Sequence, residues 1–267
     1  MTLRSHAANG VLLAGGASTR MGRPKALLQI PGSGHFLIED QLERLARAGC
    51  AHIAGVLGAD AERIAGALDR SRSFAPETLP GRPQVLLCRN AAWEQGPFSS
   101  LQMGLRALAP SPRGAVVLPL DVPGVGGRVF ERLLTAALAG VSARPSDTGA
   151  IAGRESDTDI EAGAGPDSGT DIEASAGPDS GTDVDTGDTL AGSAPDAVIP
   201  TFAGRGGHPI WIAPQTIAAI LAAPPSARLD HLLRGLCCER LTVEDPRVRG
   251  NVNTQEDWER YCASLAG

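Results

Sequence analysis

The sequence predicts an α/β fold of three layers, in which a mostly parallel sheet is covered by helices. Three observations indicate this class. Short apolar runs alternate with amphipathic, helix-like stretches along most of the 267 residues, the pattern of parallel strands joined by helices. A hydrophobic content of 42% is enough for one ordinary buried core. The alternation stops between residues 146 and 197, where the composition becomes acidic and repetitive.

Local patterns predict the individual elements. Strands are expected at the apolar runs 10–13, 53–57, 85–88, 115–120, 198–202, 209–212 and 240–243. Helices are expected where apolar residues recur at helical spacing, at 36–47, 61–68, 100–108, 128–138, 215–222 and 255–265. In the first helix, Leu37, Leu42 and Leu45 share one face. Because ligands of such sheets bind at the carboxyl ends of the strands, the residues just after each strand are the first candidates for a site.

The segment 146–197 differs from the rest of the chain in charge. It has thirteen Asp or Glu residues and one Arg, a local charge of −12 in a chain of net charge −6, which leaves +6 for the remainder. Residues 159–170 and 171–182 are near-copies of a 12-residue unit with one Ile each. This is too little apolar surface to offset an ordering cost of about 1–2 kcal/mol per residue. We expect a disordered acidic insert, rather than a solenoid or a calcium-binding repeat, within a single domain formed by 1–145 and 198–267.

Composition excludes several classes of protein. The mildly basic body suits an anionic ligand, but with 3% aromatic residues the chain does not resemble a dedicated nucleic-acid binder. Five scattered cysteines without Cys-x-x-Cys spacing argue against a disulfide framework and against a zinc site, and favour the reducing cytoplasm. No apolar run approaches the roughly 18 residues of a membrane span. We expect a soluble cytoplasmic protein that binds neither nucleic acid nor a membrane.

A glycine-rich turn follows the first strand. Residues 13–25 read Leu-Ala-Gly-Gly-Ala-Ser-Thr-Arg-Met-Gly-Arg-Pro-Lys. Free backbone N–H groups in such a turn can bind phosphate oxygens, and three cations within six residues would balance a triphosphate. The spacing matches neither a Rossmann fingerprint nor a Walker loop, and a plain strand-to-helix connection is the structural alternative. The residues expected to contact phosphate are Leu13, Ala14, Gly15, Gly16, Arg20 and Lys25.

Asp121 directly follows the strand predicted at 115–120, between Pro119 and Pro123. A carboxylate at this edge is well placed to hold Mg²⁺ beside phosphate groups. Its alternative role is to accept hydrogen bonds from the N–H groups of a turn or helix end.

The last predicted helix begins with Gly-Asn-Val-Asn-Thr-Gln-Glu-Asp, residues 250–257. Thr254 and Asp257 resemble a capping box in which Asp replaces Glu. Asn251 and Asn253 are not explained by capping, and their amide oxygens are candidates to complete a metal shell or to bind a phosphate or sugar.

Two further segments contain candidate ligand contacts. Ser99 and Ser100 open a helix at the same sheet edge and are candidates to contact a nucleobase or ribose, with N-capping by Ser99 as the alternative. Arg205 and His208 lie in Gly-Arg-Gly-Gly-His-Pro, residues 204–209, between two strands. They are candidates to bind a second anionic substrate, while a glycine-requiring hairpin turn explains the glycines alone.

Together these motifs resemble the MobA-like nucleotidyltransferase family, which includes molybdenum-cofactor cytidylyl- and guanylyltransferases. The resemblance rests on the glycine-rich turn, Asn90…Trp93…Gly96…Ser99-Ser-Leu, Pro119-x-Asp-x-Pro123, Gly207-His-Pro209 and Asn251-x-Asn-Thr-x-Glu-Asp257. It implies a Rossmann-like nucleotidyltransferase fold, one nucleoside triphosphate, Mg²⁺ as cofactor and release of pyrophosphate.

The resemblance also suggests roles and substrates. Arg20 and Lys25 would stabilise the reacting phosphates, and Asp121, with Asn251 or Asn253, would hold the metal. The Arg-Met-Gly-Arg-Pro-Lys motif is similar to the cytidylyl branch and the Asn-x-Asn-Thr motif to the guanylyl branch. We expect CTP as donor and molybdopterin as acceptor, with GTP or a sugar phosphate as alternatives, and a molybdoenzyme or maturation protein as a candidate partner. A nucleotide- or cofactor-binding chaperone without catalysis is the alternative of another class.

Overall fold

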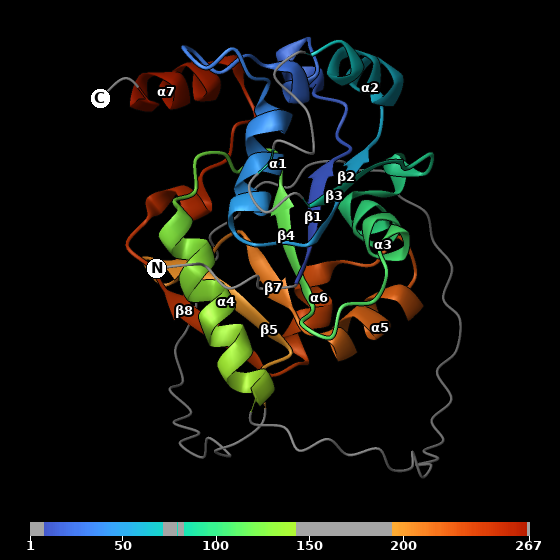
Figure 1. Cartoon of the computed structure of the whole chain (residues 1–267), viewed down its shortest axis with the longest axis vertical. Helices are drawn as coiled ribbons and strands as arrows, with labels where there is room; N and C mark the ends of the chain where they lie inside the picture. The colour runs from blue at the N-terminus through green and yellow to red at the C-terminus, as the bar shows by residue number, and fades with distance from the viewer. Residues whose placement is uncertain (1–7, 72–78, 80–82, 143–193, 266–267) are drawn as a thin grey trace, which may run out of the picture. The chain divides into compact units, whose positions relative to one another are not determined.

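The computed structural model describes residues 8–71, 79, 83–142 and 194–265. Within them, one sheet has the strand order β3-β2-β1-β4-β7-β5-β6, and β8, which is off this path, also pairs with β5 (Figure 1). The strands are β1 (Asn9–Ala14), β2 (His52–Leu57), β3 (Gln84–Arg89), β4 (Ala115–Pro119), β5 (Ala197–Phe202), β6 (Arg205–Gly206), β7 (Ile210–Ile212) and β8 (Cys238–Thr242).

Helices connect and cover these strands. The α-helices are α1 (Leu37–Arg47), α2 (Ala61–Arg70), α3 (Pro97–Ala107), α4 (Gly127–Ser142), α5 (Pro214–Ala222), α6 (Leu229–Arg234) and α7 (Gln255–Leu265). Short 3-10 turns are η1 (Thr19–Met21), η2 (Lys25–Leu27), η4 (Trp93–Gln95) and η5 (Pro246–Arg249). Among the described residues no helix combines the length and the apolar composition of a membrane span.

The four strands β3, β2, β1 and β4 run parallel, so their carboxyl ends meet at one edge of the sheet. In Figure 1 the arrows of β1, β2 and β4 point toward the end of the molecule where α2 and α7 lie. Strand β7 pairs antiparallel with β4 and with β5, and β5 pairs parallel with β8. Strands β7, β5, β6 and β8 therefore form a half of the sheet with both parallel and antiparallel pairs, which extends beyond β4 on the side away from β1.

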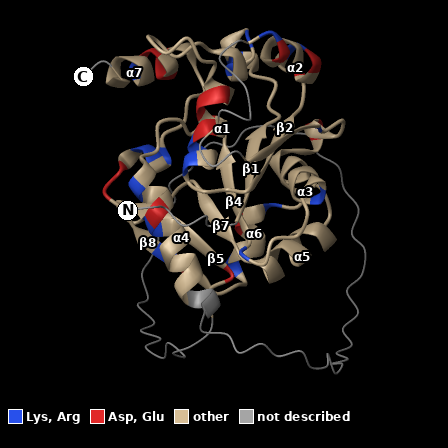
Figure 2. Cartoon of the chain, in the orientation of Figure 1, with Lys and Arg blue, Asp and Glu red and all other residues tan. Residues whose placement is uncertain are grey.

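The core has two parts because neighbouring strand residues point to opposite faces of the sheet. On β1, Leu12 belongs to the buried cluster that includes residues of α1, α2, α4 and α7, while Val11 belongs to the one that includes α3, α5 and α6. Gly104 lets α3 approach the sheet closely, since a Cβ there would lie 2.6 Å from Val11 Cγ1. Figure 2 shows that β1, β2 and β4 carry no charged residue, as expected for strands covered on both faces.

The predicted α/β class with a mostly parallel sheet is confirmed, and each predicted strand forms. Helix α3 begins at Pro97, earlier than predicted, because proline is favoured in a first helical turn. The sequence did not predict α6 or β6; with six and two residues they are too short for a periodicity to emerge.

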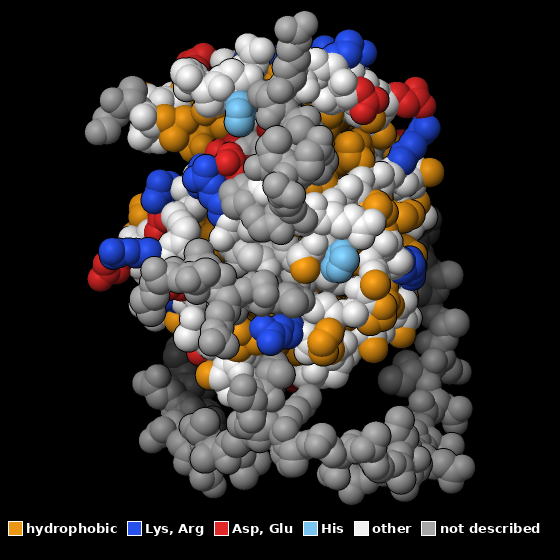
Figure 3. Space-filling view, viewed as in Figure 1, with side chains coloured by type: hydrophobic (Ala, Val, Ile, Leu, Met, Phe, Trp, Pro, Cys, Tyr) orange, Lys and Arg blue, Asp and Glu red, His pale blue; other side chains and the backbone are white. Residues whose placement is uncertain are grey.

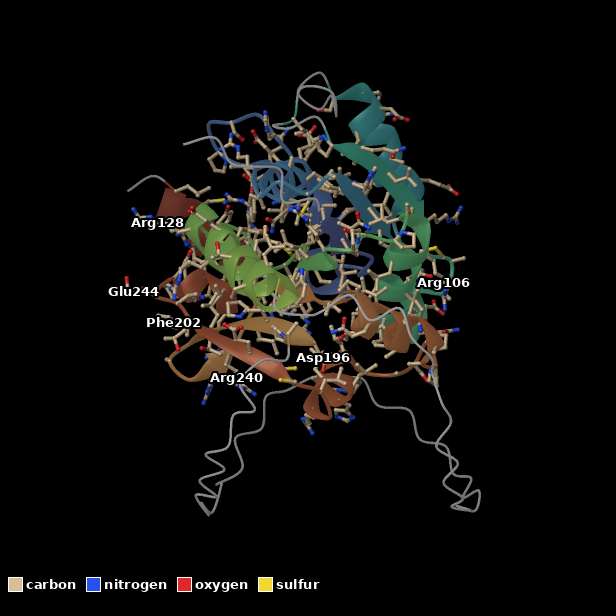
Figure 4. All side chains as sticks on the ribbon, turned by 60° about the horizontal axis from the view of Figure 1, so that its bottom comes forward. Arg106, Arg128, Asp196, Phe202, Arg240 and Glu244 are labelled. Atoms are coloured by element: carbon tan, nitrogen blue, oxygen red, sulfur yellow. The ribbon has the colours of Figure 1, made fainter. Side chains whose placement is uncertain are left out.

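The predicted insert boundary is wrong at its C-terminal end. Contacts group Met1–Arg144 and Ser193–Gly267 into one compact unit, separate from Pro145–Gly192. Ala197 is the first residue of β5, and Ala194 is 4% exposed. The carboxylate of Asp196, labelled in Figure 4, accepts hydrogen bonds from Cys237 N at 3.0 Å and Gln215 Nε2 at 2.9 Å. Residues 194–197 therefore belong to the folded unit, while the repeats at 159–182 lie outside the described residues and their disorder stays a prediction.

Candidate active site

The glycine-rich turn leaves β1 at the carboxyl edge of the sheet. Gly15 packs closely: a Cβ on it would lie 2.9 Å from Ser100 Oγ, and one on Gly58 would collide with the Gly15 backbone. Gly16, by contrast, is exposed, and a Cβ there would meet nothing within 4 Å. The structure therefore brings the predicted residues Gly15 and Ser100 together and leaves backbone open to a ligand at Gly16.

Ser18 turns the chain back toward the sheet. Its φ of 52° is left-handed, a conformation that non-glycine residues rarely adopt. In this conformation its hydroxyl oxygen accepts a 3.1 Å hydrogen bond from the backbone N–H of Lys25. No local sequence pattern predicts this role for Ser18, because the contact spans seven residues of irregular chain and exists only in three dimensions.

Lys25 lies at the centre of the site. Its Nζ donates a 2.7 Å hydrogen bond to Asn253 Oδ1. Burial lowers the pKa of the ammonium group from 10.5; the charge of Asp121 opposes this shift and the charge of Arg20 adds to it. The charges of Arg20 and Asp121 thus act on Lys25, and the hydrogen bond to Asn253 brings the C-terminal segment to the same place.

Asp121 follows β4 in a firmly held turn. Leu120 N donates to Leu13 O at 2.9 Å, which ties this turn to the start of the glycine-rich turn. Val252 N donates to Asp121 O at 2.8 Å, which brings the two asparagines alongside. Burial raises the pKa of the Asp121 carboxyl group, and the charge of Lys25 partly counteracts it. The backbone N–H of Asp121 itself also lowers this pKa by hydrogen bonding to the carboxylate, as in a turn. Asp121 is not the N-cap of the helix that follows, since α4 begins only at Gly127.

The start of α7 confirms the predicted capping box. Asp257 Oδ2 accepts the N–H groups of Asn253 and Thr254 at 3.0 and 2.9 Å, and Asp257 N donates to Thr254 Oγ1 at 3.1 Å. The hydrogen bond from Asn253 N is the main reason that the pKa of Asp257 is lowered. This box fixes the backbone of Asn253 next to Lys25, whereas Asn251 is exposed.

A network of buried polar side chains lies beside the glycine-rich turn at Gly15. Asn90 Nδ2 donates to Ser99 Oγ at 2.9 Å and to Ser100 Oγ at 3.0 Å, and all three residues are buried. Ser99 Oγ in turn donates to Gly96 O at 2.8 Å. N-capping by Ser99 is wrong, because the N-cap of α3 is Gly96. The two hydroxyls shape the loop beside Gly15, and their predicted contact with a nucleotide stays a prediction.

The predicted acceptor residues lie on a hairpin. Ala203 and Gly204 have φ of 49° and 73°, and Phe202 pairs with Arg205, so the hairpin interpretation of the glycines is confirmed there. Arg205 is exposed. Among the described residues neither Arg205 nor His208 forms a hydrogen bond or ion pair with Lys25 or Asp121.

His208 sits in a different environment from Arg205. Its Nδ1 atom is buried and makes no hydrogen bond within the described residues, and burial lowers its pKa to about 4. At neutral pH the ring is therefore uncharged, so binding of an anion by a positive charge on His208 is not supported.

The donor atoms near Asp121 fit a hard divalent cation. They are carboxylate and amide oxygens, the ligand type that Mg²⁺ and Mn²⁺ prefer. No group of three or more His, Cys, Asp or Glu residues suited to a metal exists in the described part of the chain. A cation bound at Asp121 would therefore take the rest of its shell from amide oxygens, water and phosphate, as Mg²⁺ does in phosphate-transferring sites.

Charge on the visible surface is mixed. On the face drawn in Figure 3, the Lys and Arg side chains of the described residues form several separate groups with Asp and Glu among them. This arrangement suits local contacts with a small anion more than a continuous track for a nucleic-acid backbone.

Comparison with known proteins adds three findings. A probable molybdenum cofactor guanylyltransferase of Mycobacterium ulcerans is 30% identical over 130 residues, which cover 48% of this chain and 56% of the relative. The nicotine blue oxidoreductase of Paenarthrobacter nicotinovorans is 36% identical over 126 residues, 47% of this chain and 54% of that protein. The chain thus spans about half the length of these curated relatives. A solved structure of a Mycobacterium tuberculosis protein in complex with manganese shares the fold, with 17% identity, a TM-score of 0.59 and coverage of 96% of this chain and 98% of that one.

A family model decides the assignment. The model described as the MobA-like NTP transferase domain matches residues 10–160, more than half of the chain. The match includes the glycine-rich turn, Lys25 and Asp121, the residues that the structure gathers at the edge of the sheet. The family suggested by the sequence motifs is confirmed: the chain belongs to the MobA-like NTP transferase domain family.

Proposed function

We propose that the protein is a Mg²⁺-dependent nucleotidyltransferase. It would move a nucleoside monophosphate from a nucleoside triphosphate to a phosphate-bearing acceptor and release pyrophosphate. The observation that carries this proposal is the convergence of Lys25, Asp121 and Asn253 at the carboxyl edge of the parallel strands, beside an open glycine-rich turn.

The reaction requires alignment more than covalent help from the protein. An oxygen of the acceptor phosphate attacks the α-phosphorus, a new P–O bond forms, and the bond from the α-phosphorus to the bridging oxygen breaks. Pyrophosphate leaves with the bonding electrons. The attacking oxygen is already ionised at neutral pH, so no general base is needed. Catalysis then comes from positioning and from neutralising the charge of the phosphates.

Each site residue has a role in this scheme. The backbone of residues 13–16 would bind the β- and γ-phosphates. Lys25, held by Asn253, would stabilise charge on the α-phosphate and on the departing pyrophosphate, with Arg20 beside it. Asp121 would hold Mg²⁺, with Asn251 or Asn253 as further ligands. The cation would supply positive charge that neutralises the phosphates when it is bound.

The donor nucleotide is proposed to be GTP, with molybdopterin as the acceptor. The sequence motif around Arg23 favours CTP, but the Mycobacterium ulcerans relative carries the name guanylyltransferase. The manganese in the Mycobacterium tuberculosis structure supports a divalent cation, with Mg²⁺ as our proposal for this chain.

An oxidoreductase, as the name of the Paenarthrobacter relative suggests, is the second candidate function. It would require a redox cofactor. The glycine-rich turn lacks the G-x-G-x-x-G spacing of a dinucleotide site, which favours the transferase.

A pyrophosphate-release assay tests the proposal. The protein is mixed with Mg²⁺ and each of GTP, CTP, ATP and UTP, with and without molybdopterin, and the product is identified by mass spectrometry. We expect release that depends on both GTP and acceptor. Release with CTP alone among the nucleotides would restore the cytidylyltransferase interpretation. A panel of sugar phosphates separates the pyrophosphorylase alternative, and nucleotide binding without release with any acceptor would indicate a binding-only chaperone.

A further inference from the structure

Gln41 is a buried glutamine on the apolar face of α1. Its side chain is 0% exposed, as are those of its helix neighbours Ile38, Leu42 and Leu45. Its Nε2 donates to Val122 O at 3.0 Å and, more weakly, to Leu120 O at 3.5 Å. These two carbonyl groups stand on either side of Asp121. The carboxylate proposed to hold the metal therefore lies on a turn in which the carbonyl groups before and after it both accept from the same side-chain amide of α1.

The backbone around Asp121 is anchored to three separate parts of the chain. Besides the contacts with Gln41, Asp121 O accepts from Val252 N at 2.8 Å, and Leu120 N donates to Leu13 O at 2.9 Å. Three consecutive carbonyl oxygens are thus fixed, two of them by one side chain. The position of the carboxylate follows from the position of this backbone.

The glutamine holds the turn at a cost to its own acceptor. Its Oε1 is buried and makes no hydrogen bond within the described residues, and an unpaired buried acceptor costs free energy. An apolar residue of similar size would avoid that cost on a helix face whose other buried members include Ile38, Leu42 and Leu45. It would, however, leave the carbonyl groups of Leu120 and Val122 without this donor. The glutamine provides what an apolar residue lacks, two N–H donors aimed at the turn.

We propose that Gln41 is a positioning residue that sets the Asp121 carboxylate for divalent cation binding. This inference rests on the proposed function, since it assigns Gln41 to the metal site of that reaction. Positioning groups outside the ligand set commonly change metal affinity or activity by about 10- to 100-fold when removed.

Gln102 offers a matched control. It is also 0% exposed, its Nε2 also donates to two carbonyl groups, Ile220 O and Ala223 O, both at 2.7 Å, and its Oε1 is also unpaired within the described residues. Its partners are at the end of α5, not at Asp121. Loss of either amide should therefore cost comparable stability, while only Gln41 should affect the metal.

The experiment compares Gln41→Met and Gln102→Met in the full chain. Mn²⁺ is titrated by electron paramagnetic resonance at a fixed GTP concentration, and melting temperatures are recorded. Both variants should melt at lower temperature. The Gln41→Met variant should bind Mn²⁺ about 10- to 100-fold more weakly, with a higher KM for Mg²⁺ and little change in kcat at saturating Mg²⁺, whereas Gln102→Met should bind Mn²⁺ like the wild type. Unchanged Mn²⁺ affinity in Gln41→Met would overturn the inference.

A second readout separates this inference from the proposed function. If the wild type binds Mn²⁺ no better than Asp121→Asn, the proposed function fails, and amide hydrogen exchange then decides the role of Gln41. The N–H of Val252 donates to Asp121 O, so it exchanges slowly only while the turn is held. Exchange at this N–H should therefore be about tenfold faster in Gln41→Met than in Gln102→Met. Equal exchange would overturn the positioning role.

If Gln41→Met does not fold, Gln41→Glu replaces it. Its protonated carboxyl group donates to only one carbonyl, and its ionised form repels both. Mn²⁺ affinity of Gln41→Glu should therefore fall as pH rises, a dependence that Gln102→Glu should lack; parallel pH profiles would contradict the inference.

Discussion

The ammonium nitrogen of Lys25 and the side-chain oxygen of Asn253 are 2.7 Å apart, although 228 positions separate the residues in sequence. The sequence predicts this oxygen as a metal ligand, whereas in the structure it accepts a hydrogen bond from Lys25. An amide oxygen has two acceptor lone pairs, so the hydrogen bond leaves one for another partner. Asn253 therefore links the cation of the glycine-rich turn to the segment that lies beside Asp121.

The pKa of Lys25 is open to direct measurement. Lys25 is the only lysine in the sequence, so reductive methylation with a carbon-13 label marks it and the terminal amine alone. Titration by NMR should give a pKa below 10.5, because burial disfavours the ammonium form. In Asp121→Asn the pKa should fall further, since the charge that raises it is gone. A wild-type pKa at or above the ordinary value would contradict the buried environment.

Replacing Lys25 should slow the reaction strongly. Lys25→Ala is expected to reduce kcat by roughly 10²–10³, the usual effect of losing one preorganised charge contact. Lys25→Arg, which keeps the charge but shifts it, should lose less. Pyrophosphate release under saturating nucleotide measures both. Turnover of Lys25→Ala within a factor of two of the wild type would remove Lys25 from the mechanism.

Asp121→Asn should weaken the dependence on the metal while the protein stays folded. The amide keeps the shape of the side chain but removes the negative charge that binds a divalent cation. We expect a higher KM for Mg²⁺, measured by pyrophosphate release over a range of Mg²⁺ concentrations. Asp69→Asn, a change on the exposed end of α2, is the matched control. Equal Mg²⁺ profiles for the two variants would argue against a metal at Asp121.

Much of this site follows from the sequence, and its limits have physical causes. Residues that follow a strand can be placed at the sheet edge from periodicity alone, which located the glycine-rich turn and Asp121. The bond between Lys25 and Asn253 depends on how the chain ends meet, which no local pattern encodes. In the sequence, Gln41 is indistinguishable from an ordinary polar residue of an amphipathic helix. The N–H groups of its side chain find their carbonyl partners only when the fold packs the turn at Asp121 against α1.

Two deletions test the boundary of the acidic insert. Removing residues 146–192 with a short Gly/Ser bridge should leave cooperative thermal unfolding largely intact, because contacts do not group these residues with the compact unit of Met1–Arg144 and Ser193–Gly267. Extending the deletion through Ala197 should lower the melting temperature, since it removes the first residue of β5 and the two hydrogen bonds that the Asp196 carboxylate accepts. Equal melting of the two proteins would show that residues 194–197 contribute nothing to stability.

His208 should make the protein sensitive to mild acid. Burial lowers its folded pKa from 6.5 to about 4, so between these values the unfolded chain binds the proton more readily. The contribution of the uncharged His208 ring to the free energy of unfolding is full above the pKa of the unfolded chain, and it is lost as pH falls toward the pKa of the folded protein. Between neutral pH and about pH 5 this loss is roughly 2 kcal/mol.

Urea unfolding of His208→Gln at the two pH values measures that contribution. The variant cannot be protonated, so its stability should fall less between them than that of the wild type. The control is His231→Gln, because the His231 side chain is 60% exposed and its replacement should leave the wild-type pH dependence in place. A glutamine variant at position 208 that loses as much stability as the wild type would place the acid-sensitive group elsewhere in the fold.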